Sequence, residues 1–206
     1  MEYAGLDIAI SEDVYEPAED SFLAAETITE ELDKFEGRLS VADIGCGCGI
    51  LGLVAGTNPN VRRIVFGDIN EKAVDLCRTN INRNMALVGA DCEAVKSDLF
   101  SDINGNFDLI IFNAPYLPDN GNDKMASTWY GGASGVELSI KFLGEAVDHM
   151  ADGGEIILVV SSFGDIETLK ERINGLNLYI AREKRQHISF EDIIVMVLAR
   201  TAWFGS

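Results

Sequence analysis

The chain has 206 residues, of which 47% are hydrophobic and 24% are charged, a composition typical of a globular protein with a sizeable core. It contains no run of about eighteen apolar residues, so a membrane-spanning helix is not expected. A net charge of −18 counts against binding to nucleic acid, because neutralising phosphates requires a basic face. The N-terminus lacks the basic segment of a secretory signal, and we therefore expect a cytoplasmic protein.

From residue 39 onward, short apolar runs alternate with helical patterns, an arrangement typical of βαβ units and a mostly parallel sheet. Only a short gap separates the last two apolar segments, which favours a closing antiparallel hairpin. The expected strands lie at 39–44, 62–67, 92–96, 107–112, 154–161, 177–185 and 190–199. The expected helices lie at 19–33, 48–57, 70–84, 135–150 and 164–174.

Two of these helices carry signals at their ends. Asn70 is expected to cap the helix that follows it. The helix at 135–150 is expected to stop at Asp152-Gly153-Gly154, before the apolar strand EIILVVSS. The apolar face of the helix at 70–84 comprises Ala73, Leu76, Cys77 and Ile81.

The four cysteines predict reduced structural thiols. Cys46 and Cys48 lie in a glycine-rich turn, whereas Cys77, Cys92 and both histidines stand far from them in the sequence. A zinc site normally combines ligands at gaps of about two to four residues. No metal is therefore expected.

The segment VADIGCGCGILGL, residues 41–53, predicts a ligand-binding turn between a strand and a helix. Gly45, Gly47 and Gly49 allow the backbone to turn sharply and to approach a ligand, while the helix N-terminus offers free amides. With Gly52, the last two also satisfy the dinucleotide pattern G-x-G-x-x-G. Taken alone, this pattern is weak evidence; a plain tight turn is the alternative, which the setting between a strand and a helix disfavours.

Acidic residues follow the next two strands. Asp68 ends the second strand, where a carboxylate can accept both hydroxyls of an adenosine ribose; the alternative is a helix cap, for which Asn70 is better placed. Asp98 and Leu99 end the third strand, where an adenine ring would lie. Asp98 is also compatible with a solvated loop acid.

These features suit either a nicotinamide dinucleotide or S-adenosylmethionine. Asp43, directly before the glycines, discriminates between them. Its carboxylate would repel a pyrophosphate but attract the sulfonium and amino group of S-adenosylmethionine. The chain also lacks a second nucleotide-binding half, so S-adenosylmethionine is the expected cofactor.

With DIGCGCG, Asp68, Asp98 and NAPY in this order, the chain resembles the class I methyltransferases. More narrowly, it resembles the HemK-type glutamine methyltransferases of peptide-chain release factors, in their short archaeal and eukaryotic branch. Three stretches carry this resemblance: VYEPAEDSFL at 14–23, NAPYLP at 113–118 and TWYGGASGVELSIKFL at 128–143. The last two correspond to the N-P-P-Y motif and to a downstream Trp-x-Gly-Gly segment.

The resemblance implies an α/β, Rossmann-like fold with a seven-stranded, mostly parallel sheet, an antiparallel C-terminal hairpin and helices on both faces. It implies a single methyltransferase domain over 1–206, in which 1–38 fold over the cofactor pocket and 39–206 form the catalytic core. The implied cofactor-binding residues are Tyr15, Pro17, Asp20, Asp43, Gly45, Cys46, Gly47, Gly49, Asp68, Ile69, Asp98, Leu99 and Asn113.

The resemblance also assigns the chemistry to residues 113–116. A carboxamide nitrogen is a poor nucleophile, and two acceptors aimed at its hydrogens would hold it for methyl transfer. These acceptors are the side-chain oxygen of Asn113 and the carbonyl of Ala114, which Pro115 restricts, while Tyr116 packs against the amide. The family usually has proline in place of Ala114, but alanine keeps the carbonyl.

The implied reaction is N5-methylation of the glutamine in the Gly-Gly-Gln motif of a release factor. The alternatives are N6-methylation of adenine, methylation of another protein side chain, and a non-catalytic cofactor-binding subunit. Members of the short branch commonly work with a small zinc-binding activator, which adds a strand beside the third strand of the sheet. A self-sufficient monomer is the other possibility.

Overall fold

The structure is a computed structural model, and it describes residues 1–113 and 135–201. Its strands are β1 (Glu2–Tyr3), β2 (Leu6–Asp7), β3 (Leu39–Ile44), β4 (Val61–Asp68), β5 (Asp91–Lys96), β6 (Phe107–Asn113), β7 (Met150–Ser161), β8 (Leu178–Ile188) and β9 (Glu191–Arg200). Its helices are α1 (Glu19–Leu32), α2 (Ile50–Gly56), α3 (Glu71–Asn84), α4 (Glu137–Ala146), the 3-10 turn η2 (Val147–His149) and α5 (Ile166–Gly175). In this part of the chain, no helix is long and apolar enough to cross a membrane.

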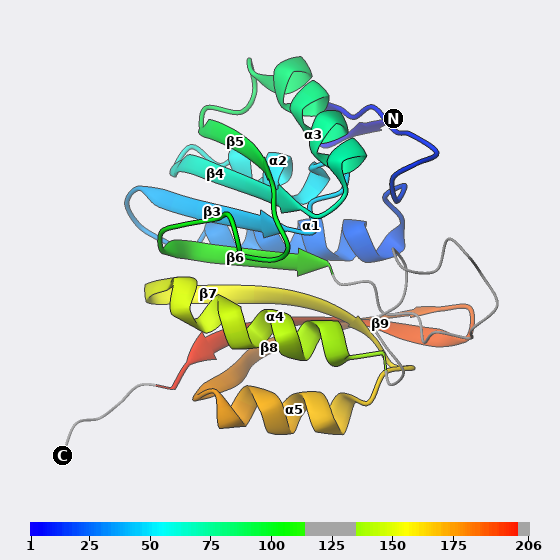
Figure 1. Cartoon of the computed structure of the whole chain (residues 1–206), viewed down its shortest axis with the longest axis vertical. Coiled ribbons are helices and arrows are strands. Elements are labelled where there is room, and N and C mark those ends of the chain that lie inside the picture. The colour runs from blue at the N-terminus through cyan, green and yellow to red at the C-terminus, as the bar shows by residue number, and fades with distance from the viewer. Residues whose placement is uncertain (114–134, 202–206) are drawn as a thin grey trace.

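Seven strands form one sheet in the order β5-β4-β3-β6-β7-β9-β8 (Figure 1). Neighbouring strands from β5 to β7 are parallel, whereas β9 runs antiparallel to both β7 and β8. The predicted parallel sheet with a closing antiparallel hairpin is therefore confirmed. The strand order reverses between β3 and β6, and in open α/β sheets ligands bind beyond the carboxyl ends of the strands at such a point.

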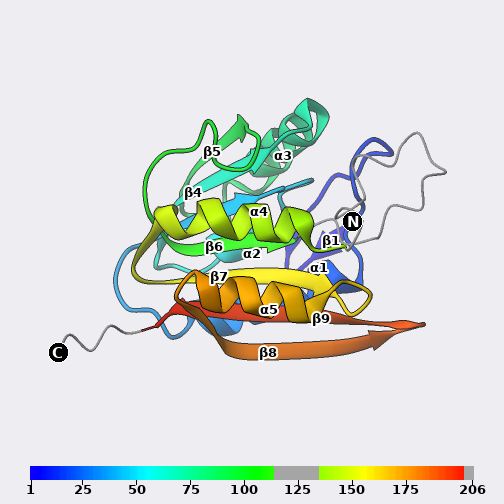
Figure 2. The ribbon, with the colours of Figure 1, turned by 60° about the horizontal axis from the view of Figure 1, so that its bottom comes forward.

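Helices cover both faces of the sheet, as Figure 2 shows with α4 and α5 in front and α1 and α2 behind. The side chains of β6 alternate between two cores because successive residues of a strand point to opposite faces. Leu109 and Ile111 pack in the core under α1 and α2, whereas Ile110 and Phe112 pack under α4 and α5. This two-sided burial explains why β6 is an unbroken apolar run in the sequence.

One predicted helix end is wrong. The helix α4 ends at Ala146 and continues only as a 3-10 turn, and β7 already begins at Met150. Asp152-Gly153-Gly154 thus lies inside β7. Phe107 pairs with Met150 but Leu109 pairs with Glu155, so β7 has three more residues than β6 between these pairs, and the glycines lie in this irregular part of the strand.

The N-terminal segment contains a small hairpin that the sequence did not predict. The strands β1 and β2 pair antiparallel, and both turn residues, Ala4 and Gly5, have positive φ, as tight hairpin turns require. The predicted cap of α3 is confirmed, because the Asn70 side chain accepts a hydrogen bond from the backbone of Lys72.

Candidate active site

A pocket of about 840 Å³ lies at the carboxyl ends of β3, β4, β5 and β6, within the range of about 300–1,000 Å³ that small-molecule sites occupy. The residues 13–21 form one of its walls. Of the residues predicted to contact a cofactor, the pocket is lined by Tyr15, Pro17, Asp20, Asp43, Gly45, Cys46, Gly47, Asp68, Ile69, Asp98, Leu99 and Asn113.

Gly49 is the predicted cofactor residue that does not line the pocket. It is the residue before α2 and has a φ of +83°, a left-handed conformation that favours glycine. A Cβ at this position would lie 2.6 Å from the Cys77 sulfur. Gly49 therefore serves the packing of the loop against α3 and does not form the surface of the pocket.

Asp43 anchors the loop at the end of β3. Its side chain is almost fully buried, and Oδ2 accepts a hydrogen bond of 2.8 Å from the Gly52 backbone. Burial raises the pKa of this carboxyl to about 8, against the lowering effect of that hydrogen bond, and the nearby Asp68 raises it further. Burial thus favours the protonated form of Asp43, whereas a bound cation would favour its ionised form.

Asp68 closes the loop from the end of β4. Its Oδ2 accepts from the Gly47 backbone at 2.9 Å, and its Oδ1 accepts from the Asn70 backbone at 2.8 Å. Desolvation raises the pKa of Asp68, and these backbone bonds oppose the shift. Each oxygen keeps a second lone pair, so the carboxylate can still accept from two ligand hydroxyls.

Apolar and charged side chains meet in the part of the pocket next to β5. Ile69 is 63% exposed although it is apolar, while Leu99 is buried. Asp98 pairs with Lys141 at 3.0 Å. Because both apolar residues line the pocket, they offer a surface on which a flat ring can pack.

Asn113, the last residue of β6, presents an unused acceptor. Its Nδ2 donates to Asp20 Oδ2 at 3.0 Å and to Ser21 Oγ at 3.3 Å. Its Oδ1 is buried and has no hydrogen-bond partner among the described residues. A buried acceptor without a partner is costly, and this one can be satisfied by an N–H group of a bound molecule.

Asp20 sets the orientation of this amide. Its Oδ1 accepts from the Tyr15 hydroxyl at 3.0 Å and from the Ser21 backbone at 2.6 Å. The Ser21 hydroxyl also donates to Oδ1, at 3.2 Å, while Oδ2 accepts from Asn113. The N-terminal segment and β6, which are about ninety residues apart in sequence, thus form one hydrogen-bonded unit.

The structure adds wall residues that the sequence did not identify. Ser21 follows Asp20, Leu138 belongs to α4, and Glu191 begins β9. A hydrogen bond from Ser161 Oγ holds the Glu191 carboxylate. Ser21 and Leu138 lie within the stretches 14–23 and 128–143 that carry the resemblance, but neither was predicted to line the pocket, and no motif marks Glu191.

Three of the four residues assigned to the chemistry, Ala114, Pro115 and Tyr116, lie outside the described residues, and their roles stay predictions. Trp129, Gly131 and Gly132 of the Trp-x-Gly-Gly segment also lie outside the described residues. Within residues 1–113 and 135–201, no cluster of His, Cys, Asp and Glu side chains is arranged to hold a metal ion.

The strand order, the closing hairpin and the pocket at the strand ends define a class I methyltransferase. The chain belongs to the methyltransferase small domain family, whose model matches residues 20–188. It is 31% identical over 201 residues to "Putative protein N5-glutamine methyltransferase" of Methanocaldococcus jannaschii, covering 95% of this chain and 96% of that protein. The class and the enzymatic nature of the chain, expected from its motifs, are thus confirmed.

Two further comparisons show that the similar methyltransferases act on different kinds of substrate. The chain is 28% identical over 145 residues to ribosomal RNA small subunit methyltransferase C of an Enterobacter strain, covering 70% of this chain but only 38% of that protein. It also resembles the solved structure of the E. cuniculi Mtq2-Trm112 complex, which methylates the eRF1 translation termination factor. That likeness has a TM-score of 0.66 and 23% identity, and it covers 91% of this chain and 99% of the solved chain.

Proposed function

We propose that the protein transfers a methyl group from S-adenosylmethionine to the side-chain nitrogen of the glutamine in the Gly-Gly-Gln motif of a peptide-chain release factor. The observation that carries this proposal is the buried, unpartnered Oδ1 of Asn113 at the edge of the pocket. A carboxamide NH₂ is a donor that such an acceptor can bind and orient. The names of the relative from M. jannaschii and of the E. cuniculi complex support a glutamine of a termination factor.

The residues of the pocket fit this cofactor. The second lone pairs of Asp68 suit two ribose hydroxyls, and the surfaces of Ile69 and Leu99 suit an adenine ring. Asp43 and the loop backbone would face the cationic end of the molecule, and that positive charge would favour the ionised form of the buried Asp43 carboxyl. The cofactor supplies an electrophilic methyl group.

The residues of the protein contribute to the reaction by orienting the substrate nitrogen toward the methyl group. Asp20 and Ser21 hold the Nδ2 side of the Asn113 amide, and this orientation leaves its oxygen buried and without a partner among the described residues. This oxygen and the carbonyl of Ala114 would each accept one hydrogen of the substrate NH₂, and Tyr116 would cover its plane. Holding the nitrogen in line with the methyl group contributes much of the rate, because alignment removes an entropic barrier.

We further propose that residues 1–206 act as one methyltransferase domain in the cytoplasm, with residues 1–38 completing the cofactor pocket. A small zinc-binding activator beside β5 suits this surface, because β5 is an edge strand of the sheet, to which a strand of another chain can be added. Met85 and Leu87, which precede it, are 68% and 53% exposed. A comparison of methylation rates with and without such a subunit tests this part of the proposal.

Methylation of an exocyclic amino group in nucleic acid is the second candidate. The same Asn113 oxygen could accept from a base NH₂, and ribosomal RNA methyltransferases are among the relatives. The net charge of −18 disfavours this substrate, since phosphate contacts supply most of the affinity for nucleic acid.

Incubation with labelled S-adenosylmethionine and either a release factor or ribosomal RNA separates the two candidates. We expect mass spectrometry to find a single methyl group on the glutamine that follows two glycines. Asn113→Ala should abolish transfer while S-adenosylhomocysteine still binds. Label on RNA alone would refute the proposed substrate, and loss of cofactor binding in the variant would refute the role of Asn113.

A further inference from the structure

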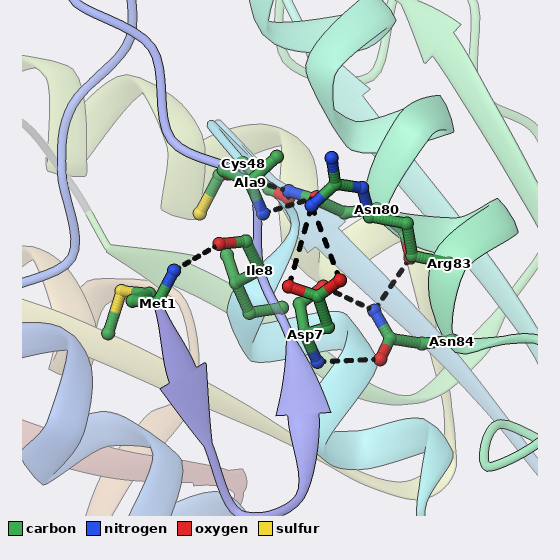
Figure 3. Close-up of polar contacts among 8 residues, drawn as sticks. All are labelled: Met1, Asp7, Ile8, Ala9, Cys48, Asn80, Arg83 and Asn84. Atoms are coloured by element: carbon green, nitrogen blue, oxygen red, sulfur yellow. Dashed lines mark hydrogen bonds and ion pairs between the residues drawn. The ribbon is translucent and has the colours of Figure 1, made fainter.

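The N-terminal segment is fastened to α3 by two buried asparagines that lie one helical turn apart (Figure 3). Asn84 accepts from the Asp7 backbone at 2.9 Å and donates to the Asp7 carbonyl at 3.0 Å. Asn80 likewise accepts from the Ala9 backbone at 2.7 Å and donates to the Ala9 carbonyl at 3.0 Å. Together they bind the segment as a neighbouring strand would, through both backbone groups of alternate residues.

Asn80 differs from Asn84 in one contact. Its Nδ2 also donates to the carbonyl of Cys48 at 2.9 Å, whereas Nδ2 of Asn84 donates to the carbonyl of Asn80 within the same helix. Cys48 belongs to the glycine loop and lines the pocket. A single, fully buried side chain therefore links the N-terminal segment, the helix α3 and the loop that borders the cofactor site.

The segment beyond Ala9 forms a wall of the same pocket. Lys72 pairs with Asp13 at 2.7 Å, and Asn70 donates to the Asp13 carbonyl at 3.3 Å. Val14 is buried, and its Cγ1 lies 3.7 Å from the position of a Cβ on Gly47. The residues 7–17, which we call the strap, thus run from the asparagine pair across the glycine loop to the wall of the pocket.

We propose that Asn80 is a positioning residue for cofactor binding, because it holds the strap and the glycine loop in one fixed arrangement. This inference rests on the proposed function, because it takes S-adenosylmethionine as the ligand of the pocket. Without the Asn80 side chain, the carbonyls of Cys48 and Ala9 and the amide of Ala9 lose a buried partner. The loop and the strap can then separate, and the cofactor leaves faster.

Asn80→Ala and Asn84→Ala form a matched pair to test this. Both remove a buried amide from the same face of α3 and release part of the strap, but only the first disconnects the glycine loop. For S-adenosylhomocysteine, we expect Asn80→Ala to raise Kd about 10- to 100-fold through faster dissociation. Asn84→Ala should change Kd by less than about threefold, while thermal melting reports the stability of each variant.

The kinetic readout separates positioning from chemistry. At saturating cofactor, kcat of Asn80→Ala should stay within about threefold of wild type, because Asn80 lies behind the loop and does not touch the reacting groups. Equal Kd values for wild type and Asn80→Ala, or equal effects of both substitutions, would overturn the proposal. Failure of the wild-type protein to bind S-adenosylhomocysteine would instead refute the proposed function.

Amide hydrogen exchange of the wild-type protein provides a test that does not depend on a folded variant. The Ala9 amide donates to Asn80 and the Asp7 amide donates to Asn84. Saturation with S-adenosylhomocysteine should slow exchange at Ala9 by about tenfold or more, and more than at Asp7. Unchanged exchange at Ala9, with protection at Gly47, would show that the asparagine contacts are independent of the pocket and would overturn the proposal.

Discussion

Asp20→Asn is the substitution that most sharply tests how the amide of Asn113 is oriented. Asp20 Oδ1 accepts from the Ser21 backbone and the Tyr15 hydroxyl, and its Oδ2 accepts from Asn113 Nδ2. In the variant, the single remaining oxygen satisfies the first two donors, and the introduced NH₂ faces the NH₂ of Asn113. Two donors repel, so the amide of Asn113 should turn over and present a donor to the pocket.

The expected loss is large because an acceptor aimed at the substrate is replaced by a donor. Removing one oriented hydrogen bond to the reacting group typically costs about 2.7–4 kcal/mol, which corresponds to roughly 10²–10³ in kcat. Ser21→Ala removes the 3.3 Å contact to Asn113 and the 3.2 Å hydrogen bond from the Ser21 hydroxyl to Asp20 Oδ1, but it leaves the Asp20–Asn113 hydrogen bond in place, and a net neutral hydrogen bond is worth only about 0.5–1.5 kcal/mol. We therefore expect a loss of about tenfold or less for this control.

The assay is single-turnover methylation at saturating cofactor, with the Kd of S-adenosylhomocysteine measured in parallel. Combining Asp20→Asn with Asn113→Asp should recover part of the lost rate, because a carboxylate at position 113 can accept from the introduced amide and still offer an oxygen to the substrate. A rate for Asp20→Asn within about threefold of wild type would refute the reasoning. So would a loss in cofactor affinity as large as the loss in rate.

Three further substitutions test the pocket and its supports. Asp68→Asn should raise the Kd of S-adenosylhomocysteine about 10- to 100-fold in calorimetry, because one hydroxyl partner and the charge are lost; an unchanged Kd would place the ribose elsewhere. The pKa of Asp43 is about 8 in the folded protein and 3.8 in the unfolded chain. Between these two values the folded protein holds one proton more than the unfolded chain. The free energy of unfolding therefore falls as pH rises, by about 1.4 kcal/mol per pH unit. In the absence of cofactor, the Tm of Asp43→Asn should therefore fall less between pH 6 and pH 8 than the Tm of the wild type. An equal fall of Tm in the two proteins would contradict this. Gly52→Ala places a Cβ 2.3 Å from the buried Phe66 ring and should cost about 1–3 kcal/mol, or roughly 2–12 °C in Tm. Gly89→Ala, where nothing lies within 4 Å, is the control that should melt like wild type.

The order of strands and helices could be predicted because the buried strands of this sheet are continuous apolar runs. The run LIIF before Asn113 is buried on both faces, and such a pattern leaves little choice of element. The end of α4 could not be predicted in the same way. Gly153 and Gly154 favour a helix stop and a bulge equally, and only the pairing with β6 decides between them.

The candidate site was predictable where a motif places residues at strand ends, as for Asp43, Asp68 and Asn113. Two other pocket residues were not predicted. Ser21 meets Asn113, and Glu191 reaches the pocket, only because the fold brings together segments that are far apart in the sequence. Asn80 and Asn84 illustrate the same limit. Polar residues on a helix are usually exposed, yet both are buried, because the backbone of the strap supplies their hydrogen bonds.

A crystal structure with S-adenosylhomocysteine tests the central claim most directly. The account predicts that the sulfur lies beside the Asn113 side chain, with the ribose hydroxyls on Asp68 and the adenine between Ile69 and Leu99. A ligand whose sulfur lies away from the end of β6, or whose ribose does not reach Asp68, would contradict it.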